Sequence, residues 1–156
     1  MSSPARGSAH EAAAERLRGK GQRYTGARRR LIEILSRSRS PLTIPEILRR
    51  RRGLAMSSAY RNLAELEDAG IVRRVHTDEG FSRYELNEEL TGHHHHLICS
   101  NCGRTTDVTL PIDLERKIER DLDAVAARAG FADVGHRLDL IGTCTDCASK
   151  RAEIRA

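Results

Sequence analysis

Hydrophobic positions in the first half of the chain recur at the spacing of short amphipathic helices. After an Ala-rich stretch, His10 to Arg18, that is typical of a helix, the next helix is expected to begin at Thr25, a residue suited to cap it. Its apolar residues fall at positions 31, 34 and 35, which share one helical face. Residues 1–9 are small and polar, and we expect them to be disordered.

Two further helices are predicted before residue 70. Thr43 and Glu46 fit a capping box, with a proline in the first turn, which predicts a short helix to about residue 50. The third has apolar residues at positions 59, 63 and 66, with Ser57 or Ser58 as its expected cap. Gly70 is expected to end it.

The periodicity then changes to that of β-strands. Ile71 to His76 and Ser82 to Leu86 are strand-like, and Asp78-Glu79-Gly80 between them favours a hairpin turn. Three short helices followed by a two-stranded hairpin is the order of a winged helix-turn-helix, which places one helix in the DNA major groove. The alternative is a small helical domain that binds nothing.

The second half alternates strands with one long helix. Strands are predicted at His93 to Cys99, Arg104 to Leu110 and Val134 to Ile141, and Pro111 opens a helix with an apolar stripe that Gly130 ends. We therefore predict an α+β protein with a winged helix-turn-helix over residues 1–86, a small α/β domain over 87–148 and a charged tail over 149–156.

Charge separates the same two halves. Of the 156 residues, positions 1–75 hold 17 Lys/Arg and 7 Asp/Glu, a net charge of +10, and positions 76–156 hold 10 and 15, a net charge of −5. A basic half favours a polyanionic partner, although a merely solvated basic surface would look the same. The chain has no apolar stretch near the ~18 residues of a membrane span and no signal peptide at its start, so we expect a cytoplasmic protein without a membrane partner.

Four cysteines form two Cys-x-x-Cys pairs, Cys99 with Cys102 and Cys144 with Cys147. In a cytoplasmic protein such pairs are more often metal ligands than disulfides, and two of them together make a four-sulfur cage typical of structural zinc. Free core cysteines or a redox pair are the alternatives. A closed cage has no open position for a substrate, so it favours structure over catalysis.

A run of four histidines, His93-His94-His95-His96, leads into the first cysteine pair. On a strand their side chains alternate, so His93 and His95 are expected on one face and His94 and His96 on the other. Each pair can begin a site for zinc, iron, manganese or nickel. Further ligands could come from four other residues: His76, Glu85, Glu119 and His136. The alternative is a polar strand with solvated histidines.

The chain resembles the ferric uptake regulator family. The resemblance rests on Tyr60-Arg61-x-Leu63, Gly70-Ile71-Val72, Tyr84-Glu85-Leu86, the segment His93 to Gly103, Gly130-Phe131, His136 and the segment Gly142 to Cys147. It covers about residues 15–148. It implies a winged helix followed by an α/β dimerisation domain, and a homodimer that binds a double-stranded DNA operator in a metal-dependent way, usually as a repressor of metal-uptake genes.

The resemblance also implies roles for individual residues. The four cysteines correspond to a structural zinc site. A regulatory site between the domains would take His94 and His96, with Glu85 and His76 as further ligands. An additional site would take His93, His95, Glu119 and His136, with Glu115 as the alternative to Glu119. The regulatory metal, zinc, iron(II) or manganese(II), stays open because the stretch Ser40 to Thr43 lacks a histidine found in many iron and peroxide sensors, and Asn87 stands where several zinc sensors have a cysteine.

Candidate DNA contacts lie at the start of the third helix and before the first capped one. Arg61 can donate two hydrogen bonds to guanine, Tyr60 can pack on thymine methyl groups, and Ser57 lies with them. Arg23 is expected to reach the DNA backbone or minor groove. No nucleophile elbow, phosphate-binding loop, dinucleotide fingerprint or zinc deaminase pattern is present, so we expect neither an enzyme nor a small-molecule substrate. The alternatives kept open are a zinc-containing thiol redox switch and a peroxide-sensing regulator of the same family.

Overall fold

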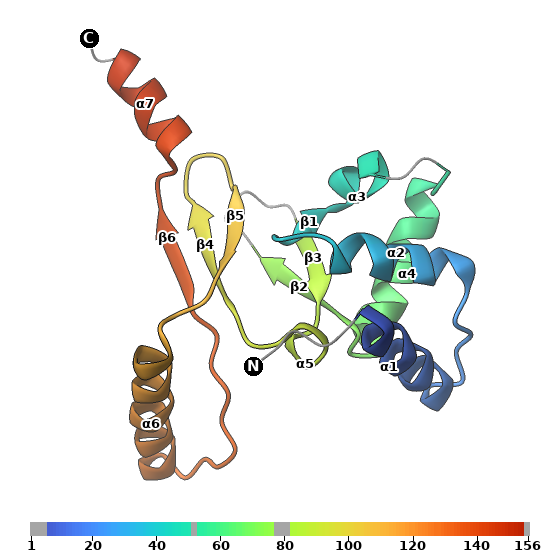
Figure 1. Cartoon of the computed structure of the whole chain (residues 1–156), viewed down its shortest axis with the longest axis horizontal. Coiled ribbons are helices and arrows are strands. Elements are labelled where there is room, and N and C mark those ends of the chain that lie inside the picture. The colour runs from blue at the N-terminus through green and yellow to red at the C-terminus, as the bar shows by residue number, and fades with distance from the viewer. Residues whose placement is uncertain (1–5, 51–52, 77–81, 155–156) are drawn as a thin grey trace.

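The computed structural model describes residues 6–50, 53–76 and 82–154 (Figure 1). Four helices dominate its first half: α1 (Arg6–Gly19), α2 (Gly26–Ser36), α3 (Ile44–Arg50) and α4 (Met56–Asp68). Their apolar faces enclose a core of fully buried aliphatic residues that includes Leu17, Leu31, Ile47 and Leu63. The sequence placed residues 6–9 in a disordered lead; instead they begin α1, because Ala9 and the following turns pack into this core.

A small antiparallel sheet completes this half. It consists of β1 (Leu42–Thr43), β2 (Val72–His76) and β3 (Ser82–Leu86) in the order β1-β3-β2, with Arg73 opposite Glu85 in the β2–β3 pair. Helices α2 to α4 followed by the β2–β3 hairpin give the winged helix-turn-helix order expected from the sequence. The expected turn at 78–80 lies outside the described residues.

The helix boundaries follow local hydrogen bonds, and one expected cap is wrong. Thr25 caps α2 by accepting a hydrogen bond from the Arg28 N–H, and at α3 the Glu46 carboxylate accepts the Thr43 N–H at 2.7 Å, as a capping box requires. At α4 neither Ser57 nor Ser58 is the cap, because the helix begins earlier, at Met56, with Ala55 in the cap position and no side-chain hydrogen bond.

The second half holds α5 (Glu88–Thr91), β4 (His95–Cys99), β5 (Thr105–Val108), α6 (Ile112–Arg128), β6 (Asp139–Gly142) and α7 (Thr145–Ile154). Its sheet has the order β5-β4-β6, with β4 antiparallel to β5 and parallel to β6. Three expectations need correction. The last strand begins at Asp139, not Val134; residues 149–154 of the expected tail belong to α7; and the four-residue α5 had no counterpart among the predicted elements.

The two sheets lie beside each other, joined through α5, and α6 stands apart from the four-helix region (Figure 1). Helix α6 has no buried residue, and its apolar side chains Leu114, Leu122 and Val125 are 40–53% exposed. Buried hydrophobic residues in the described chain lie almost entirely before residue 91; Ile98 and Cys99 are the ones beyond it. None of the helices in the described residues has the length and apolar character needed to cross a membrane.

Candidate metal centres and DNA-binding face

The four cysteines converge at the far end of the second sheet. Cys99 ends β4 and Cys102 follows in the next turn, while Cys144 and Cys147 flank the start of α7. The four cysteine sulfurs all lie within 4.8 Å of one another, and those of Cys102 and Cys144 are 3.8 Å apart. Tetrahedral zinc with Zn–S distances of about 2.3 Å has sulfurs about 3.8 Å apart. All four thiols are free of disulfides, so the arrangement fits the cage expected from the sequence.

The thiols also have unequal proton affinities. Backbone N–H groups, first that of Cys144, hydrogen-bond the Cys99 sulfur and lower the pKa of this thiol to about 6. Hydrogen bonds with the neighbouring sulfurs, Cys144 first, raise the pKa of Cys147 to about 12. Four sulfurs this close cannot all ionise without a compensating cation, and a divalent soft metal such as zinc supplies that charge.

The histidine run splits between two sites with the alternation expected from the sequence, although β4 itself begins at His95 and not at the predicted His93. His94 and His96 belong to a group with Glu85 and Asp107, called here the inter-sheet cluster. His93 and His95 belong to a group with Glu115 and His136, called here the α6 cluster. In each group one side-chain atom per residue lies within 4.8 Å of the others.

The inter-sheet cluster draws its members from both sheets. One Glu85 oxygen, Oε2, lies 3.3 Å from His94 Nε2 and 3.0 Å from His96 Nε2. Glu85 comes from β3, His94 and His96 from the approach to β4 and from β4 itself, and Asp107 from β5. Sequence reasoning missed Asp107. Asp107 joins the cluster because the β4–β5 register places it directly opposite His96, and this register cannot be derived from the sequence pattern.

Buried charge shapes the inter-sheet cluster. Burial alone would raise the pKa of Glu85, but hydrogen bonds from His94 and His96 outweigh it and lower this pKa to about 2. The Glu85 hydrogen bond raises the pKa of His94 to about 9. Burial raises the pKa of Asp107, and its Oδ1 is buried without a hydrogen-bond partner among the described residues. The cluster thus offers two imidazoles and two carboxylates, one of which has an oxygen without a hydrogen-bond partner among the described residues. This donor set suits zinc, iron(II) or manganese(II).

Asp139 supports this cluster from behind. Its Oδ1 lies 3.2 Å from His96 Nδ1, while the other ring nitrogen of His96 faces Glu85. A carboxylate on the outer nitrogen fixes the tautomer of a metal-binding imidazole and turns the inner nitrogen toward the metal. The pKa of His96 is raised: burial lowers it, and the hydrogen bonds with Glu85 and Asp139 more than compensate.

The α6 cluster is built around Glu115. Its two carboxylate oxygens lie 2.9 Å from His95 Nε2, 3.2 Å from His93 Nε2 and 3.0 Å from His136 Nε2. Within the described chain, Glu115 Oε1 and His136 Nε2 are nevertheless buried without a well-directed hydrogen bond. Two buried polar atoms that lie close together without a hydrogen bond fit a site for a cation. Burial raises the pKa of Glu115, but the histidines, His95 first, lower it overall.

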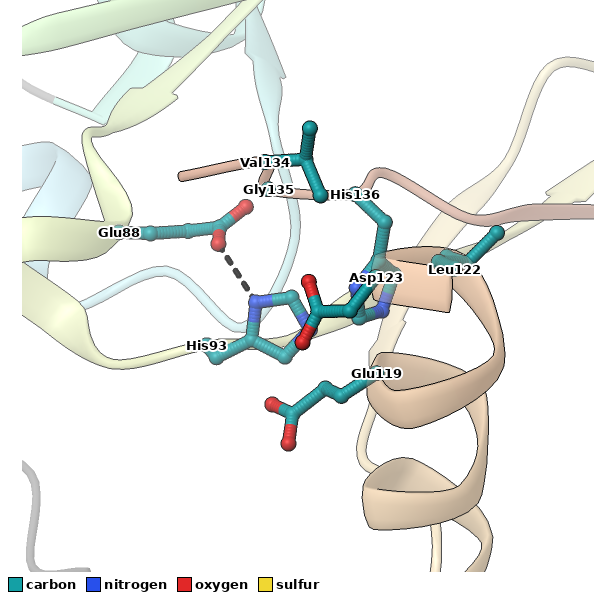
Figure 2. A pocket seen from close by; sticks show the side chains of 8 residues that line it. All are labelled: Glu88, His93, Glu119, Leu122, Asp123, Val134, Gly135 and His136. Atoms are coloured by element: carbon teal, nitrogen blue, oxygen red, sulfur yellow. Dashed lines mark hydrogen bonds and ion pairs between the residues drawn. The ribbon is translucent and has the colours of Figure 1, made fainter. Parts of the chain in front are cut away.

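Glu119 was expected in this cluster, and the structure brings Glu115 there instead. Helix α6 begins at Ile112, so the residue in its first turn faces the histidines, and Glu119 lies one turn further along. Figure 2 shows Glu119 and Asp123 projecting from α6 toward a neighbouring cavity of about 290 Å³, which His93 and His136 also line. Glu119 therefore lines the approach to the cluster.

Two other residues considered as ligands are also placed. His76 is the last residue of β2, and its side chain lies outside the described residues. Asn87 caps α5 by accepting a hydrogen bond from the Glu89 N–H.

The expected DNA-contacting residues lie on exposed positions of the first half. Ser57, Tyr60 and Arg61 lie in the first turns of α4, with Tyr60 55% exposed, and Arg23 precedes α2. Arg28, almost fully buried, connects the two regions: it donates hydrogen bonds to the Arg23 carbonyl and, at 3.2 Å, to Asn62 of α4. The sequence did not single out Arg28, because it is one of three consecutive arginines at positions 28–30.

The sequence profile of the Ferric uptake regulator family matches residues 19–141. The chain is 36% identical over 120 residues to the Zinc uptake regulation protein of Mycobacterium tuberculosis, covering 76% of this chain and 87% of that one. It is 30% identical over 139 residues to the Ferric uptake regulation protein of Neisseria gonorrhoeae, covering 86% and 92%. The fold matches that of the Helicobacter pylori ferric uptake regulator with a TM-score of 0.74 over 95% of this chain and 97% of that one, at 24% identity.

The chain belongs to the ferric uptake regulator family. It is a metal-responsive transcriptional regulator and not an enzyme, as the sequence indicated. The predicted α+β class, with a winged helix followed by a small domain that gathers four cysteines, is confirmed.

Proposed function

We propose that this protein is a metal-dependent DNA-binding repressor of metal-uptake genes, switched by a divalent metal at the inter-sheet cluster. The observation that carries the proposal is the origin of the ligands. Glu85 belongs to the sheet of the winged helix, whereas His96 and Asp107 belong to the second sheet. A site that takes ligands from both sheets favours the arrangement in which they are held together.

The chain's own residues set the terms of this switch. Without metal, His94 carries a proton at neutral pH, because Glu85 raises its pKa to about 9, and this proton must leave before Nε2 can act as a ligand. A metal bound here would supply the positive charge that the His94 proton otherwise provides to Glu85. The imidazoles of His94 and His96 and the carboxylates of Glu85 and Asp107 would hold the metal, and β3 would then be tied to β4 and β5.

The proposed DNA-binding face is the exposed start of α4 together with the segment before α2. Arg61 and Tyr60 would contact base edges, Ser57 would bond near them, and Arg23 would contact the backbone or minor groove. The net charge of +10 over residues 1–75 supports a polyanionic partner, and the buried Arg28 keeps the Arg23 segment in place beside α4.

The remaining parts have supporting roles. The four-cysteine cage would hold a structural zinc that ties β4 to α7, and the α6 cluster would hold an additional metal. The protein would act as a homodimer, because the apolar stripe of α6 is exposed in a single chain and a second copy would cover it. A twofold dimer matches an operator with two half-sites.

The metal is not fixed by the ligand types. Nitrogen and oxygen donors suit zinc, iron(II) and manganese(II), and the relatives named above are a zinc and a ferric uptake regulation protein. Binding of promoter DNA should therefore be titrated with zinc, iron(II), manganese(II) and nickel(II) in turn, at one fixed salt concentration, because phosphate contacts make affinity salt-dependent.

The matched comparison uses His96→Ala, which removes a ligand of the inter-sheet cluster and leaves the cysteines intact. We expect one metal to tighten operator binding of the wild-type protein and to have little effect on this variant. Equal operator affinity with and without metal at the inter-sheet cluster, while the cysteine cage keeps its zinc, would refute the proposal.

A further inference from the structure

Arg73 lies between the two histidine clusters. It sits on β2 opposite Glu85 of β3, and its side chain is only 11% exposed. Its Nε donates to Glu85 Oε1 and its Nη1 donates to Glu88 Oε1, while Nη2 lies 3.5 Å from His94 Nε2. One guanidinium therefore bonds two carboxylates and approaches a candidate ligand of the inter-sheet cluster.

Glu88 continues the connection to the other cluster. It begins α5, and its second oxygen, Oε2, lies 2.8 Å from His93 Nδ1. The opposite nitrogen of that ring, Nε2, lies 3.2 Å from Glu115 Oε1 in the α6 cluster. Glu88 also lines two cavities, one of about 290 Å³ beside His93 and one of about 200 Å³ beside His94.

Each of these bonds fixes how a ligand is presented. Because Arg73 takes Oε1 of Glu85, the other oxygen is the one that faces His94 and His96. Because Glu88 takes Nδ1 of His93, Nε2 of that ring is the nitrogen directed into the α6 cluster. The guanidinium is always charged and its planar fork has a fixed geometry, so displacing one of its carboxylates disturbs the other.

We propose that Arg73 is a positioning residue that couples the two histidine clusters, so that a metal in one cluster raises the affinity of the other. This rests on the proposed function in that both clusters are taken to bind metal. The coupling is positive because one arrangement of Arg73 and Glu88 presents ligands to both clusters, directing Glu85 Oε2 into one and His93 Nε2 into the other. A metal that holds one of these ligands in place favours the arrangement that presents the other.

Cobalt(II) is the probe, because its absorption reports each site's occupancy and ligand field without DNA. The affinity of the α6 cluster is measured in the wild type and in His96→Ala, which disables the inter-sheet cluster. The reciprocal measurement uses His136→Ala and follows the inter-sheet cluster. We expect each disabled cluster to weaken the other by roughly fivefold or more, by the same factor in both directions.

The same two affinity measurements are then repeated in variants that break the connection from Arg73 through Glu88 to His93, called here the bridge. In Arg73→Met and in Glu88→Gln we expect the factor to fall to about one. Glu88→Gln breaks the same bridge from a short surface helix, so it decides the matter should Arg73→Met fail to fold. Arg74→Met is the matched control: Arg74 is the next residue of β2, pairs with Glu67 at 2.9 Å, and should leave the factor unchanged.

The outcomes separate this inference from the function it rests on. If the wild-type protein binds no cobalt(II) at the inter-sheet cluster, the proposed function fails. If both clusters bind but disabling one leaves the other unchanged, or if the factor survives in both bridge variants, the role of Arg73 is refuted and the proposed function stands.

Discussion

Four imidazoles that are adjacent in the chain end in two different electrostatic environments. His94 and His96 share one oxygen of Glu85, whereas His93 and His95 meet the carboxylate of Glu115. Strand alternation predicts this division from the sequence alone. Asp107 and Glu115 could not be predicted with the same ease, since one depends on the β4–β5 register and the other on where α6 begins.

The contact between Glu85 and His94 makes the stability of the metal-free protein depend on pH. The pKa of Glu85 is lowered from 4.5 to about 2, so its contribution is present above pH 4.5 and is lost as the pH falls toward 2. The pKa of His94 is raised from 6.5 to about 9, so its contribution is present below pH 6.5 and is lost as the pH rises through 9. We expect the free energy of unfolding by urea to fall by on the order of 2 kcal/mol between pH 6.5 and 9. Glu85→Gln should flatten this alkaline limb, and an equally steep limb in that variant would contradict the assignment.

Replacing the supporting carboxylate tests the orientation of His96. Asp139→Asn keeps the size of the side chain but weakens the hold on His96 Nδ1, so we expect metal affinity at the inter-sheet cluster to fall by about 10–100-fold. Competition with a chelating dye measures it. Asp121→Asn, on the exposed surface of α6 beside Lys117, is the control and should bind as the wild type does. Equal losses in the two variants would point to a general charge effect.

Secondary-structure elements with strong periodicity or capping chemistry were the predictable ones. Helices α2 and α3 begin where Thr25 and Thr43 indicated, and β3 has the predicted bounds. The two-residue β1 and the four-residue α5 are too short for a periodic pattern to reveal them. Pairing with the distant β3 defines β1, whereas α5 is a single helical turn capped by Asn87. Helix α4 begins at Met56 without a side-chain cap, so the prediction that Ser57 or Ser58 caps it placed its start too late.

The start of α4 is the proposed site of base recognition. Arg61 is exposed near the start of this helix, and removal of a guanidinium that bonds a base should cost ~1–3 kcal/mol of specific binding. Arg61→Ala is therefore expected to weaken operator binding while affinity for an unrelated duplex changes much less, as fluorescence anisotropy would measure. Arg128→Ala removes the same charge at the end of α6 and should leave the preference for the operator intact. Unchanged operator affinity in Arg61→Ala would remove α4 from the DNA-binding face.

Across the whole molecule, apolar burial is uneven. The connected core runs from Ala9 to Leu90, while the second half exposes Leu122, Val125, Phe131 and Ile141. The sequence predicted both halves and the apolar stripe of α6, because each depends on local pattern. It could not predict how the two sheets lie relative to each other, since that arrangement follows from contacts between residues far apart in the chain.

Association of two copies should therefore depend on the stripe of α6. Leu122→Glu places a charge on this exposed apolar face, and we expect it to weaken self-association by more than about tenfold, because the charge would be buried without a partner. Sedimentation equilibrium measures the dissociation constant. Arg120→Glu introduces the same side chain on the opposite face of the helix and should associate normally. If Leu122→Glu associates as tightly as the wild type, the contact between copies lies elsewhere.

The four consecutive histidines, His93 to His96, which span the start of β4, also affect how the sequence can change in evolution. A one-residue insertion or deletion there turns every neighbouring side chain to the other side of the strand. If the neighbouring positions held other residues, a shift by one residue would remove imidazoles from both clusters at once. Here the loss of one histidine still leaves three in alternation, so each side keeps at least one imidazole. A one-residue shift of this segment would therefore leave part of each cluster's imidazole set in place while compensating changes accumulate.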